Sequence, residues 1–557
     1  MSWLNTGAYR CLELLVRAKD GEEAAEIRLK ESSEESERCE RVLPGYFRWL
    51  RLPVKRDTQY EIAFSGCFPG LMYLSESEDM METGIQYLEL PEDGMGELTK
   101  RGRSDGRYRE RYHFTPYKNW INDPNGLCWF DGYYHMFYQY NPFSQKWGSM
   151  YWGHAVSRDL IWWKDLPIVL EPQKEILDDP TCWGGAFSGS AVLPGDGSMV
   201  FYFTRHLEGT KKWIEPEEVQ MMAKSWDGIR FGEERVVIKR EVFGASPNFR
   251  DPKAVLGKDG RWYLVLGSCV EEVPSVLYYR SDDMETWTYE GVLLGEMKAE
   301  GIEAIECPDI FWLDGKMVVT TSLMRYCQEP VERQHVRYYI GNWEHGRFQV
   351  ETTEVLDFGG NFYAVQTFEY EGQRIAIGWA ADFWKEHVEE ENGSNGSMTI
   401  PRIMEIWGGT LRMRPVESVY QLKDRCIFKG NGNSLDLPEI RGNAWYARIE
   451  PERSSDFRMC LMKNGSSKLY LDYRNGELRI ITDSEQVKRP DGTAFVRAVR
   501  KVEIFTDRRM TELFINDGEV SAVRIFYGGE HGSFQMDFSD RSVPVSTEVY
   551  TMASIWN

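Results

Sequence analysis

The sequence lacks several features that would assign it to particular classes of protein. No apolar run approaches the roughly 20 residues that a membrane-spanning helix needs. The N-terminus has no basic stretch followed by an apolar one, so it does not resemble a signal peptide. The ten cysteines are scattered and none forms a CxxC pair, which argues against a zinc ribbon. Scattered cysteines without a secretion signal predict reduced thiols and a cytoplasmic protein.

Positive charge is also scarce. The 66 Lys and Arg residues stand against 88 Asp and Glu residues, which gives a formal net charge of −22. Such a surface repels phosphates, so we expect neither nucleic acid nor an anionic membrane as a partner. Aromatic residues, by contrast, make up 14% of the chain and include 20 Trp and 29 Tyr. Aromatic rings fill the cores of sheets, and in a cleft they also pack against the C–H faces of sugars.

A degenerate repeat runs through the middle of the chain. An acidic-Gly turn followed by an alternating apolar strand occurs five times, at Asp131-Gly132, Asp196-Gly197, Asp259-Gly260, Asp314-Gly315 and Glu371-Gly372. Between successive copies lies a second pattern, Ser-x-Asp-x-x-x-aromatic, found at residues 157–163, 225–231 and 281–287. A degenerate fourth copy retains only Glu344 and Phe348. Each unit therefore has about four strands, and five units predict a five-bladed β-propeller. The alternative is a β-sandwich rich in Asp-Gly turns, but the interleaving of two patterns favours the propeller.

The same repeat predicts a site. The residue eight positions before each turn is polar in all five units: Asp123, Ser188, Asp251, Glu306 and Tyr363. Equivalent positions in the blades lie on a ring about the axis, so three carboxylates are expected to meet at one mouth of the channel. Like charges raise one another's pKa and are costly without a function. Two carboxylates and a helper fit glycoside hydrolysis, in which one acid attacks the anomeric carbon and another protonates the leaving oxygen.

The amino-acid sequences of the motifs also resemble those of a known family. In chain order the motifs are WINDPNG (120–126), FYQYNP (137–142), KWG (146–148), YWGHAVSRDLIWW (151–163), FSGSAV (187–192), FRDPK (249–253) and ECPD (306–309). Together they resemble glycoside hydrolase family 32, the family of invertases, levanases and inulinases. The resemblance covers residues 110–420 closely. It implies a five-bladed propeller that is followed by a β-sandwich.

The resemblance implies a role for each of the three acids. Asp123 would be the nucleophile, Asp251 would stabilise the fructosyl transition state, and Glu306 would be the acid/base. The implied reaction is the retaining hydrolysis of terminal β-D-fructosyl bonds of sucrose or fructo-oligosaccharides, through a covalent fructosyl-enzyme. The implied substrate contacts are Trp120, Asn122, Gln139, Trp147, Phe187, Ser188 and Arg250, and Tyr363 and Trp379 complete the candidate set.

The chemistry of these roles carries its own expectations. Asp123 must be ionised to attack, and we expect Arg250, hydroxyls and backbone N–H groups to lower its pKa. Glu306 must hold a proton to act as an acid. No metal or cofactor is needed. The three acids could instead form a calcium site, but their spacing lacks a ligand loop. Cys307, beside Glu306, could act as a nucleophilic thiol, but it has no evident His partner. It is therefore predicted to be a small, buried side chain.

Two departures from the family pattern stand out. Asn361 occupies a position at which family members commonly have an Asp, which puts one polar contact near the pocket rim in doubt. Residues 205–220, RHLEGTKKWIEPEEVQ, form a charged insertion in the second unit. This insertion either shapes the entrance of the site or is a solvated loop.

The chain divides into three predicted parts. Residues 1–104 show short alternating runs and predict a small N-terminal β domain, for packing or for homo-oligomer formation. Residues 105–424 form the propeller, and residues 425–557 alternate like a β-sandwich. The expected partner is a sugar or fructan. A fructosyltransferase of the same family, a non-catalytic fructan-binding propeller and an arabinofuranosidase remain as alternatives.

Overall fold

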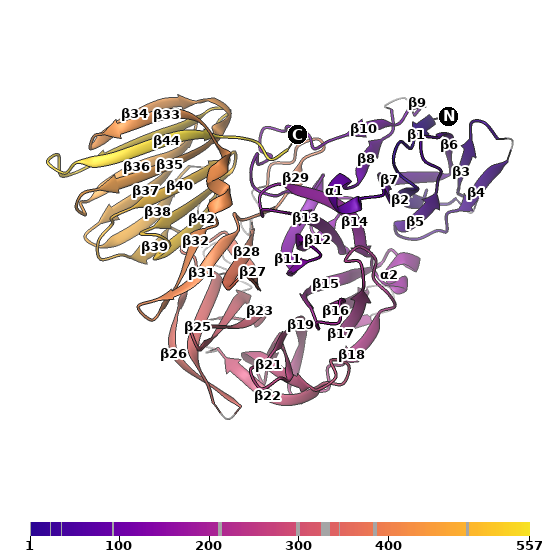
Figure 1. Ribbon diagram of the computed structural model, residues 1–557, viewed down its shortest axis with the longest axis horizontal. Coiled ribbons are helices and arrows are strands. Elements are labelled where there is room, and N and C mark those ends of the chain that lie inside the picture. The colour runs from indigo at the N-terminus through magenta and orange to yellow at the C-terminus, as the bar shows by residue number, and fades with distance from the viewer. Residues whose placement is uncertain are drawn as a thin grey trace.

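The computed structural model describes residues 2–556 except 23, 35, 92–93, 210–213, 297–300, 325–334, 345, 382–386 and 486–488. The prediction of an all-β chain is confirmed. The helical segments among the described residues are the short α1 (Met80–Thr83), α2 (Lys174–Asp178), η2 (Glu417–Leu422) and η3 (Arg441–Asn443). Figure 1 shows three lobes side by side, with the N-terminal strands in indigo and the C-terminal strands in orange and yellow.

The N-terminal lobe contains two five-stranded sheets. One has the order β4-β3-β6-β1-β9, and the other β10-β8-β7-β2-β5. The strands are β1 (Ser2–Asn5), β2 (Cys11–Ala18), β3 (Glu26–Glu31), β4 (Glu37–Arg41), β5 (Arg48–Pro53), β6 (Gln59–Ser65), β7 (Cys67–Ser75), β8 (Gln86–Glu89), β9 (Gly96–Glu97) and β10 (Thr99–Arg101). Leu12 and Leu14 of one sheet share a buried core with Ile27 and Ile62 of the other, so the sheets pack face to face.

The central lobe is a ring of five sheets. Their orders are β14-β13-β12-β11-β29, β15-β16-β17-β18, β19-β20-β21-β22, β23-β24-β25-β26 and β27-β28-β31-β32, with β30 paired to β28. The inner strands β11, β15, β19, β23 and β27 neighbour one another in turn, and β27 returns to β11. This is an arrangement of the propeller type.

The strands of this ring have the following bounds: β11 (Asn119–Phe130), β12 (Tyr133–Asn141), β13 (Tyr151–Ser157), β14 (Trp163–Leu170), β15 (Cys182–Val192), β16 (Met199–Gly209), β17 (Ile214–Ser225), β18 (Arg235–Ile238), β19 (Ala245–Leu256), β20 (Trp262–Val270), β21 (Val273–Ser281), β22 (Thr288–Gly295), β23 (Ala304–Leu313), β24 (Lys316–Met324), β25 (His335–Glu344), β26 (Arg347–Val355), β27 (Phe362–Tyr370), β28 (Gln373–Ala380), β29 (Ser394–Asn395), β30 (Ser397–Met398), β31 (Arg402–Trp407) and β32 (Thr410–Pro415).

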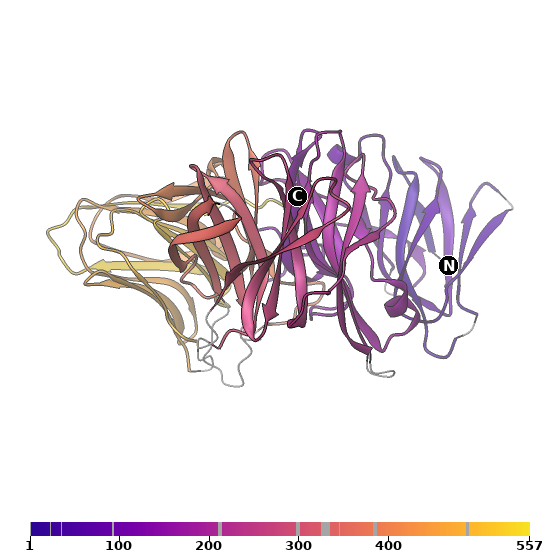
Figure 2. The same ribbon diagram turned by 90° about the horizontal axis from the view of Figure 1, so that it is seen from below.

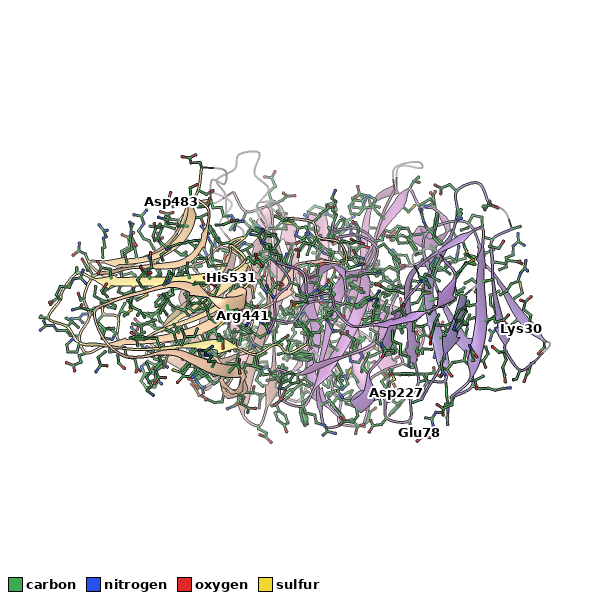
Figure 3. The ribbon with its side chains drawn as sticks, turned by 90° about the horizontal axis from the view of Figure 1, so that it is seen from above. Lys30, Glu78, Asp227, Arg441, Asp483 and His531 are labelled. Atoms are coloured by element: carbon green, nitrogen blue, oxygen red, sulfur yellow. The ribbon has the colours of Figure 1, made fainter. Side chains whose placement is uncertain are left out.

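The C-terminal lobe is a β-sandwich of two six-stranded sheets, with the orders β33-β44-β35-β40-β41-β42 and β34-β43-β36-β37-β38-β39. Its strands are β33 (Lys423–Asn431), β34 (Ser434–Ile440), β35 (Ala444–Pro451), β36 (Phe457–Asn464), β37 (Ser467–Arg474), β38 (Glu477–Asp483), β39 (Gly492–Phe495), β40 (Val502–Asp507), β41 (Met510–Ile515), β42 (Val520–Ile525), β43 (Gly532–Phe538) and β44 (Val545–Met552). Apolar residues of both sheets form one core. In Figure 3, Asp483 of this lobe and Lys30 of the N-terminal lobe lie toward opposite ends of the molecule.

The acidic-Gly pattern and the Ser-x-Asp pattern of the sequence both form turns between strands of the ring. The acidic-Gly pairs join the first and second strands of each sheet, and at Asp131, Asp314 and Glu371 both turn residues have positive φ, as a type I′ turn requires. The Ser-x-Asp pattern follows the third strand. Asp159 Oδ1 accepts hydrogen bonds from the Ser157 hydroxyl and from two later backbone N–H groups, and Asp227 and Asp283 do the same.

Each inner strand also carries a β-bulge at the same place. At this place the inner strand advances by three residues while the paired second strand advances by only two. The bulges span residues 121–124, 186–189, 250–253, 306–309 and 363–366. All five polar repeat positions fall inside these spans. A bulge bends the strand and re-aims a side chain, which is why bulges recur beside active sites. The bulges therefore turn equivalent residues of different sheets toward a common region.

The N-terminal lobe packs against the first two sheets of the ring. Tyr87 of β8 stacks on Tyr117 with ring centroids 3.8 Å apart, and Phe47 stacks on Phe143 at 3.6 Å. The Tyr46 backbone N–H donates to the Leu177 carbonyl at the end of α2. These contacts hold the segments that precede Trp147 and Trp183. Figure 2 shows the three lobes arranged in a row.

Among the described residues, no helix has the length and apolar character needed to cross a membrane.

A buried ionic network joins the ring to the sandwich. His113 is fully buried between Asp507 and Glu512, at 2.8 and 3.1 Å. Arg402 of β31 is paired with the same Glu512 at 2.6 Å and lies 3.7 Å from Asp357. Burial alone would lower the pKa of His113, but hydrogen bonds to the two carboxylates raise it to about 9.

We therefore expect His113 to make stability depend on pH. Because its pKa is about 9 in the folded protein against an ordinary value of 6.5, the charged imidazolium stabilises the fold fully below pH 6.5, and this contribution is lost as pH rises through 9. His113→Gln should lower the melting temperature most at pH 6. Calorimetry should find that the difference in melting temperature between the variant and wild type decreases steadily toward pH 9.5. A difference that stays constant across this range would contradict the assignment.

Candidate active site

A cavity of about 320 Å³ lies where the inner strands of four sheets approach one another. Its deep part is lined by residues in or beside the bulges: Asn122, Asp123, Ser188, Arg250, Asp251 and Glu306. Its mouth is lined by Trp147, Trp183, Phe187, His206 and Glu208. Ser188 and Asp251 are buried, at 1% and 5% exposed, whereas Trp147 is 43% exposed. The cavity is therefore a funnel, polar at the bottom and aromatic at the rim.

The three predicted acids meet in this cavity. The Cys307 thiol contacts Asp123 Oδ2 at 3.4 Å and Asp251 Oδ2 at 3.5 Å, so one sulfur atom lies between two carboxylates. The Cys307 backbone N–H donates to Asp251 at 2.8 Å. Asp251 and Cys307 both have positive φ, at 65° and 45°. Non-glycine residues in this region are strained, and such strain concentrates at functional sites.

Cys307 itself is buried, as predicted. Burial and the neighbouring carboxylates raise the pKa of its thiol well above the usual value. Such a thiol remains protonated and is a poor nucleophile. It is therefore a hydrogen-bond donor to the acids.

An ionic chain leads from Glu306 toward the mouth. Arg250 donates to Glu306 Oε1 at 3.0 Å and to Glu218 Oε1 at 2.7 Å. Glu218 Oε1 lies 2.9 Å from His206 Nδ1. Burial alone would raise the pKa of Glu218, but the charge of Arg250 and the hydrogen bond from His206 hold it below the usual value. The single Arg250 charge is thus shared between two carboxylates.

The pKa of Asp123 differs from the expectation. We expected Arg250 and nearby donors to lower it, but Arg250 binds Glu306 and Glu218 instead. Burial raises the pKa of Asp123, and Glu306 adds to this, while the Ser188 hydroxyl, which donates at 2.5 Å, opposes it. The pKa of Asp251 rises further, to about 8, because burial outweighs the nearby Arg250. The physical cause is that buried like charges are packed together with few cations.

Several predicted contacts lie in the cavity wall. Asn122, Gln139, Trp147, Phe187, Ser188 and Arg250 all line it. The Asn122 amide lies 3.4 Å from Gln139 Oε1 and accepts the Trp120 indole N–H at 2.8 Å. Two neighbouring side chains therefore fix the orientation of Asn122.

Three other predicted contacts lie behind the wall. Trp120 and Trp379 are not lining residues; they pack edge to face at 5.7 Å, in the apolar core beside the cavity. Tyr363 also stands behind the wall, and its hydroxyl donates to Glu306 Oε2 at 2.7 Å. The sequence suggested that these three residues contact a ligand. In the structure, Trp120 and Tyr363 contact the lining residues Asn122 and Glu306, and Trp379 packs on Trp120.

The insertion at residues 205–220 is not a solvated loop. Its described part extends β16 and β17 as a hairpin, with Arg205 opposite Val219 and His206 opposite Glu218, and residues 210–213 lie outside the described residues. His206, Glu208 and Glu218 line the cavity. Sequence reasoning missed these three residues and Trp183. The alternation of buried Glu218 and Gln220 was a possible signal, but one partner of Glu218, Arg250, comes from another sheet.

Asn361 does not reach the rim. It is fully buried; its amide donates to the Ala381 carbonyl at 2.6 Å and its oxygen accepts the Ile525 N–H at 3.1 Å. Asn361 therefore joins the ring to the sandwich. An amide supplies both the donor and the acceptor that this position uses.

Comparisons with known proteins agree with this arrangement. Residues 113–415 match the family model described as the glycosyl hydrolases family 32 N-terminal domain. The chain is 32% identical over 472 residues to a sucrose-6-phosphate hydrolase of Zymomonas mobilis, covering 78% of this chain and 88% of that protein.

Solved structures are similar as well. A family 32 glycoside hydrolase from Bifidobacterium adolescentis superposes with a TM-score of 0.88 at 28% identity, over 100% of this chain and 99% of that one. A family 32 β-fructofuranosidase of Bombyx mori gives a TM-score of 0.69 at 27% identity, over 81% and 95% of the two chains.

The raised pKa of Asp251 predicts that its charge destabilises the fold. Its pKa is about 8 in the folded protein against an ordinary value of 3.8, so the free-energy cost of ionising Asp251 grows across this range and is complete above pH 8. Asp251→Asn should therefore raise the melting temperature relative to wild type, more at pH 8.5 than at pH 5. Differential scanning calorimetry at both pH values would measure this. An equal shift at the two would contradict it.

Proposed function

Because the chain belongs to glycosyl hydrolase family 32 and is therefore a glycoside hydrolase, we propose that it is a retaining β-fructofuranosidase that hydrolyses terminal β-D-fructosyl bonds of sucrose or fructo-oligosaccharides. The observation that carries this proposal is the convergence of Asp123, Asp251 and Glu306 on one cavity. The proposal treats the five sheets of the ring as the five blades of a propeller. It treats residues 1–104 and 425–557 as separate domains beside the catalytic one.

In the first step, Asp123 attacks the anomeric carbon, C2, of the fructosyl unit. The bond from C2 to the leaving oxygen breaks, and Glu306 gives its proton to that oxygen. In the second step, water attacks C2 and Glu306 takes its proton. The Asp123 carboxylate then leaves, which releases fructose and restores both acids.

The surrounding groups suit these two steps. The Ser188 hydroxyl and the Cys307 thiol both contact Asp123 Oδ2, so they favour its ionised form and orient it. Asp251 stands on the other side of the same thiol, where its oxygens can bind ring hydroxyls. In its ionised form, which a pKa of about 8 favours only at alkaline pH, it would also stabilise an oxocarbenium-like transition state. Arg250 and Tyr363 each bind one oxygen of Glu306 and fix its orientation. Trp120 and Trp379 support the wall from behind.

Product analysis tests the proposed function. The purified protein would be incubated with sucrose, kestose, inulin and levan, each at low and high concentration, and the products separated by chromatography. Free fructose at every concentration is the expected result. Longer oligosaccharides or cyclic difructose would identify a transferase, and no turnover of any substrate would overturn the proposal.

Two substitutions test the acid assignments. Glu306→Gln should lower kcat on sucrose by about 10²–10⁴-fold, because the leaving oxygen would no longer receive a proton. Asp123→Asn should lower it at least as much, because an amide does not attack C2. Circular dichroism should be unchanged for both variants. Asp123→Asn with near wild-type activity would disprove the nucleophile assignment.

Ser188 provides a test through pH. Its hydrogen bond favours ionised Asp123, so Ser188→Ala should raise the pKa of Asp123 further. The acidic limb of the pH profile of kcat/KM should then move to higher pH, by about one unit if one charge-assisted hydrogen bond is lost. Ser190→Ala serves as the control, because its hydroxyl donates to Pro252 away from Asp123. A limb that moves equally in both variants would contradict the assignment.

A further inference from the structure

The mouth of the cavity contains a buried imidazole with one unused nitrogen. His206 of β16 is 6% exposed and lines the cavity. Its Nδ1 lies 2.9 Å from Glu218 Oε1, but its Nε2 has no hydrogen-bond partner among the described residues. Glu208 Oε2 lies 3.8 Å from Nε2, beyond hydrogen-bond distance. A buried polar atom without a partner costs free energy unless a ligand or water satisfies it.

The orientation of this imidazole is fixed. Its ring stacks on Phe187 with centroids 4.4 Å apart and planes 1° apart, and Trp183 packs on it at 5.3 Å. Glu218 is ionised and can only accept, so Nδ1 carries the hydrogen. Nε2 is therefore the ring nitrogen that remains available to a ligand. Nε2 and the Glu208 carboxylate together offer two polar groups at the mouth.

These two groups lie on the leaving-group side of the proposed reaction. The deep part of the cavity, around Ser188 and Asp251, is where the fructosyl unit must sit for Asp123 to reach C2. The rest of the substrate then extends toward the mouth. The chain from Glu306 through Arg250 and Glu218 ends at His206, so this imidazole stands on the side from which the proton is delivered.

The described charges around the cavity disfavour an anion. Among the described residues that line the cavity, Arg250 is the only lysine or arginine, and its charge is already shared by two carboxylates. Glu208 adds a negative charge whose side chain is 32% exposed. A sugar hydroxyl, which is both a donor and an acceptor, can hydrogen-bond with Nε2 and can donate to Glu208. A phosphate offers mainly acceptors and negative charge, so it would be repelled.

We propose that His206 and Glu208 form a recognition element for the leaving-group sugar, which selects a neutral, hydroxyl-bearing unit over a phosphorylated one. This specificity rests on the proposed function. It separates the chain from relatives that are named sucrose-6-phosphate hydrolases, because sucrose 6-phosphate carries its phosphate on the leaving glucose.

The first test compares kcat/KM for sucrose and for sucrose 6-phosphate. Wild type should prefer sucrose by at least about tenfold, the effect of about 1.4 kcal/mol of repulsion. Glu208→Gln should narrow this ratio, and Glu208→Lys should narrow it further. Glu217→Gln is the matched control, because Glu217 is exposed on the same hairpin, does not line the cavity and changes the net charge equally. The control should leave the ratio unchanged.

The second test removes Nε2 but keeps an aromatic ring. His206→Phe should lower kcat/KM on sucrose by about 3–10-fold, the effect of one hydrogen bond. It should lower kcat/KM less on methyl β-D-fructofuranoside, whose leaving group has no sugar ring. A purely structural role would reduce both substrates alike.

The outcomes separate this inference from the proposed function. Wild-type preference for sucrose 6-phosphate, or equal effects of the Glu208→Gln and Glu217→Gln variants, would overturn the inference while fructoside hydrolysis stands. Equal losses on sucrose and the methyl fructoside in His206→Phe would also overturn it. Failure of the wild type to hydrolyse either of these two fructosides would refute the proposed function itself.

Discussion

The burial of several carboxylates with very few cations is the constraint on which the site depends. Asp123, Asp251, Glu306 and Glu218 surround one cavity, and Arg250 is the only lysine or arginine among the described residues of its wall. Three of these carboxylates differ in consequence: Glu218 is held ionised, while the pKa values of Asp123 and Asp251 are raised. Acids whose environments differ can serve as nucleophile, stabiliser and proton donor in one reaction.

The repeated sheets deliver these acids to one place. Each inner strand is bulged at the same step, and each bulge brings one residue of the repeat toward the common region. The turns at the opposite ends of the strands fix the register, because a slip of one residue would send every side chain to the other face. The strain recorded by the positive φ of Asp251 and Cys307 is held by the sheets around them.

The flanking lobes support the ring through different kinds of contact. The N-terminal lobe stacks Phe47 on Phe143 and holds the segments that lead to the aromatic rim. The sandwich is joined by buried charges, with Arg402 between Glu512 and Asp357 in the same way that Arg250 lies between Glu218 and Glu306. A buried pair of this kind is costly to break, because removal of one partner leaves an unpaired charge. The ring, its rim and the sandwich are thus mechanically linked.

The sequence by itself determined the all-β class, the repeat and the three acids, because turn residues and strand alternation are local signals and a repeat converts them into positions on a ring. It also supplied Asn122, Gln139, Ser188 and Arg250 through their motifs. Only the tertiary structure decided that Trp120, Tyr363 and Trp379 stand behind the wall, and that His206, Glu208 and Glu218 form part of it. The pKa of Asp123 was likewise decided by packing, since Arg250 has two carboxylate partners of its own. These properties depend on which side chains of different sheets meet, and neither spacing nor local pattern encodes the distance between separate strands.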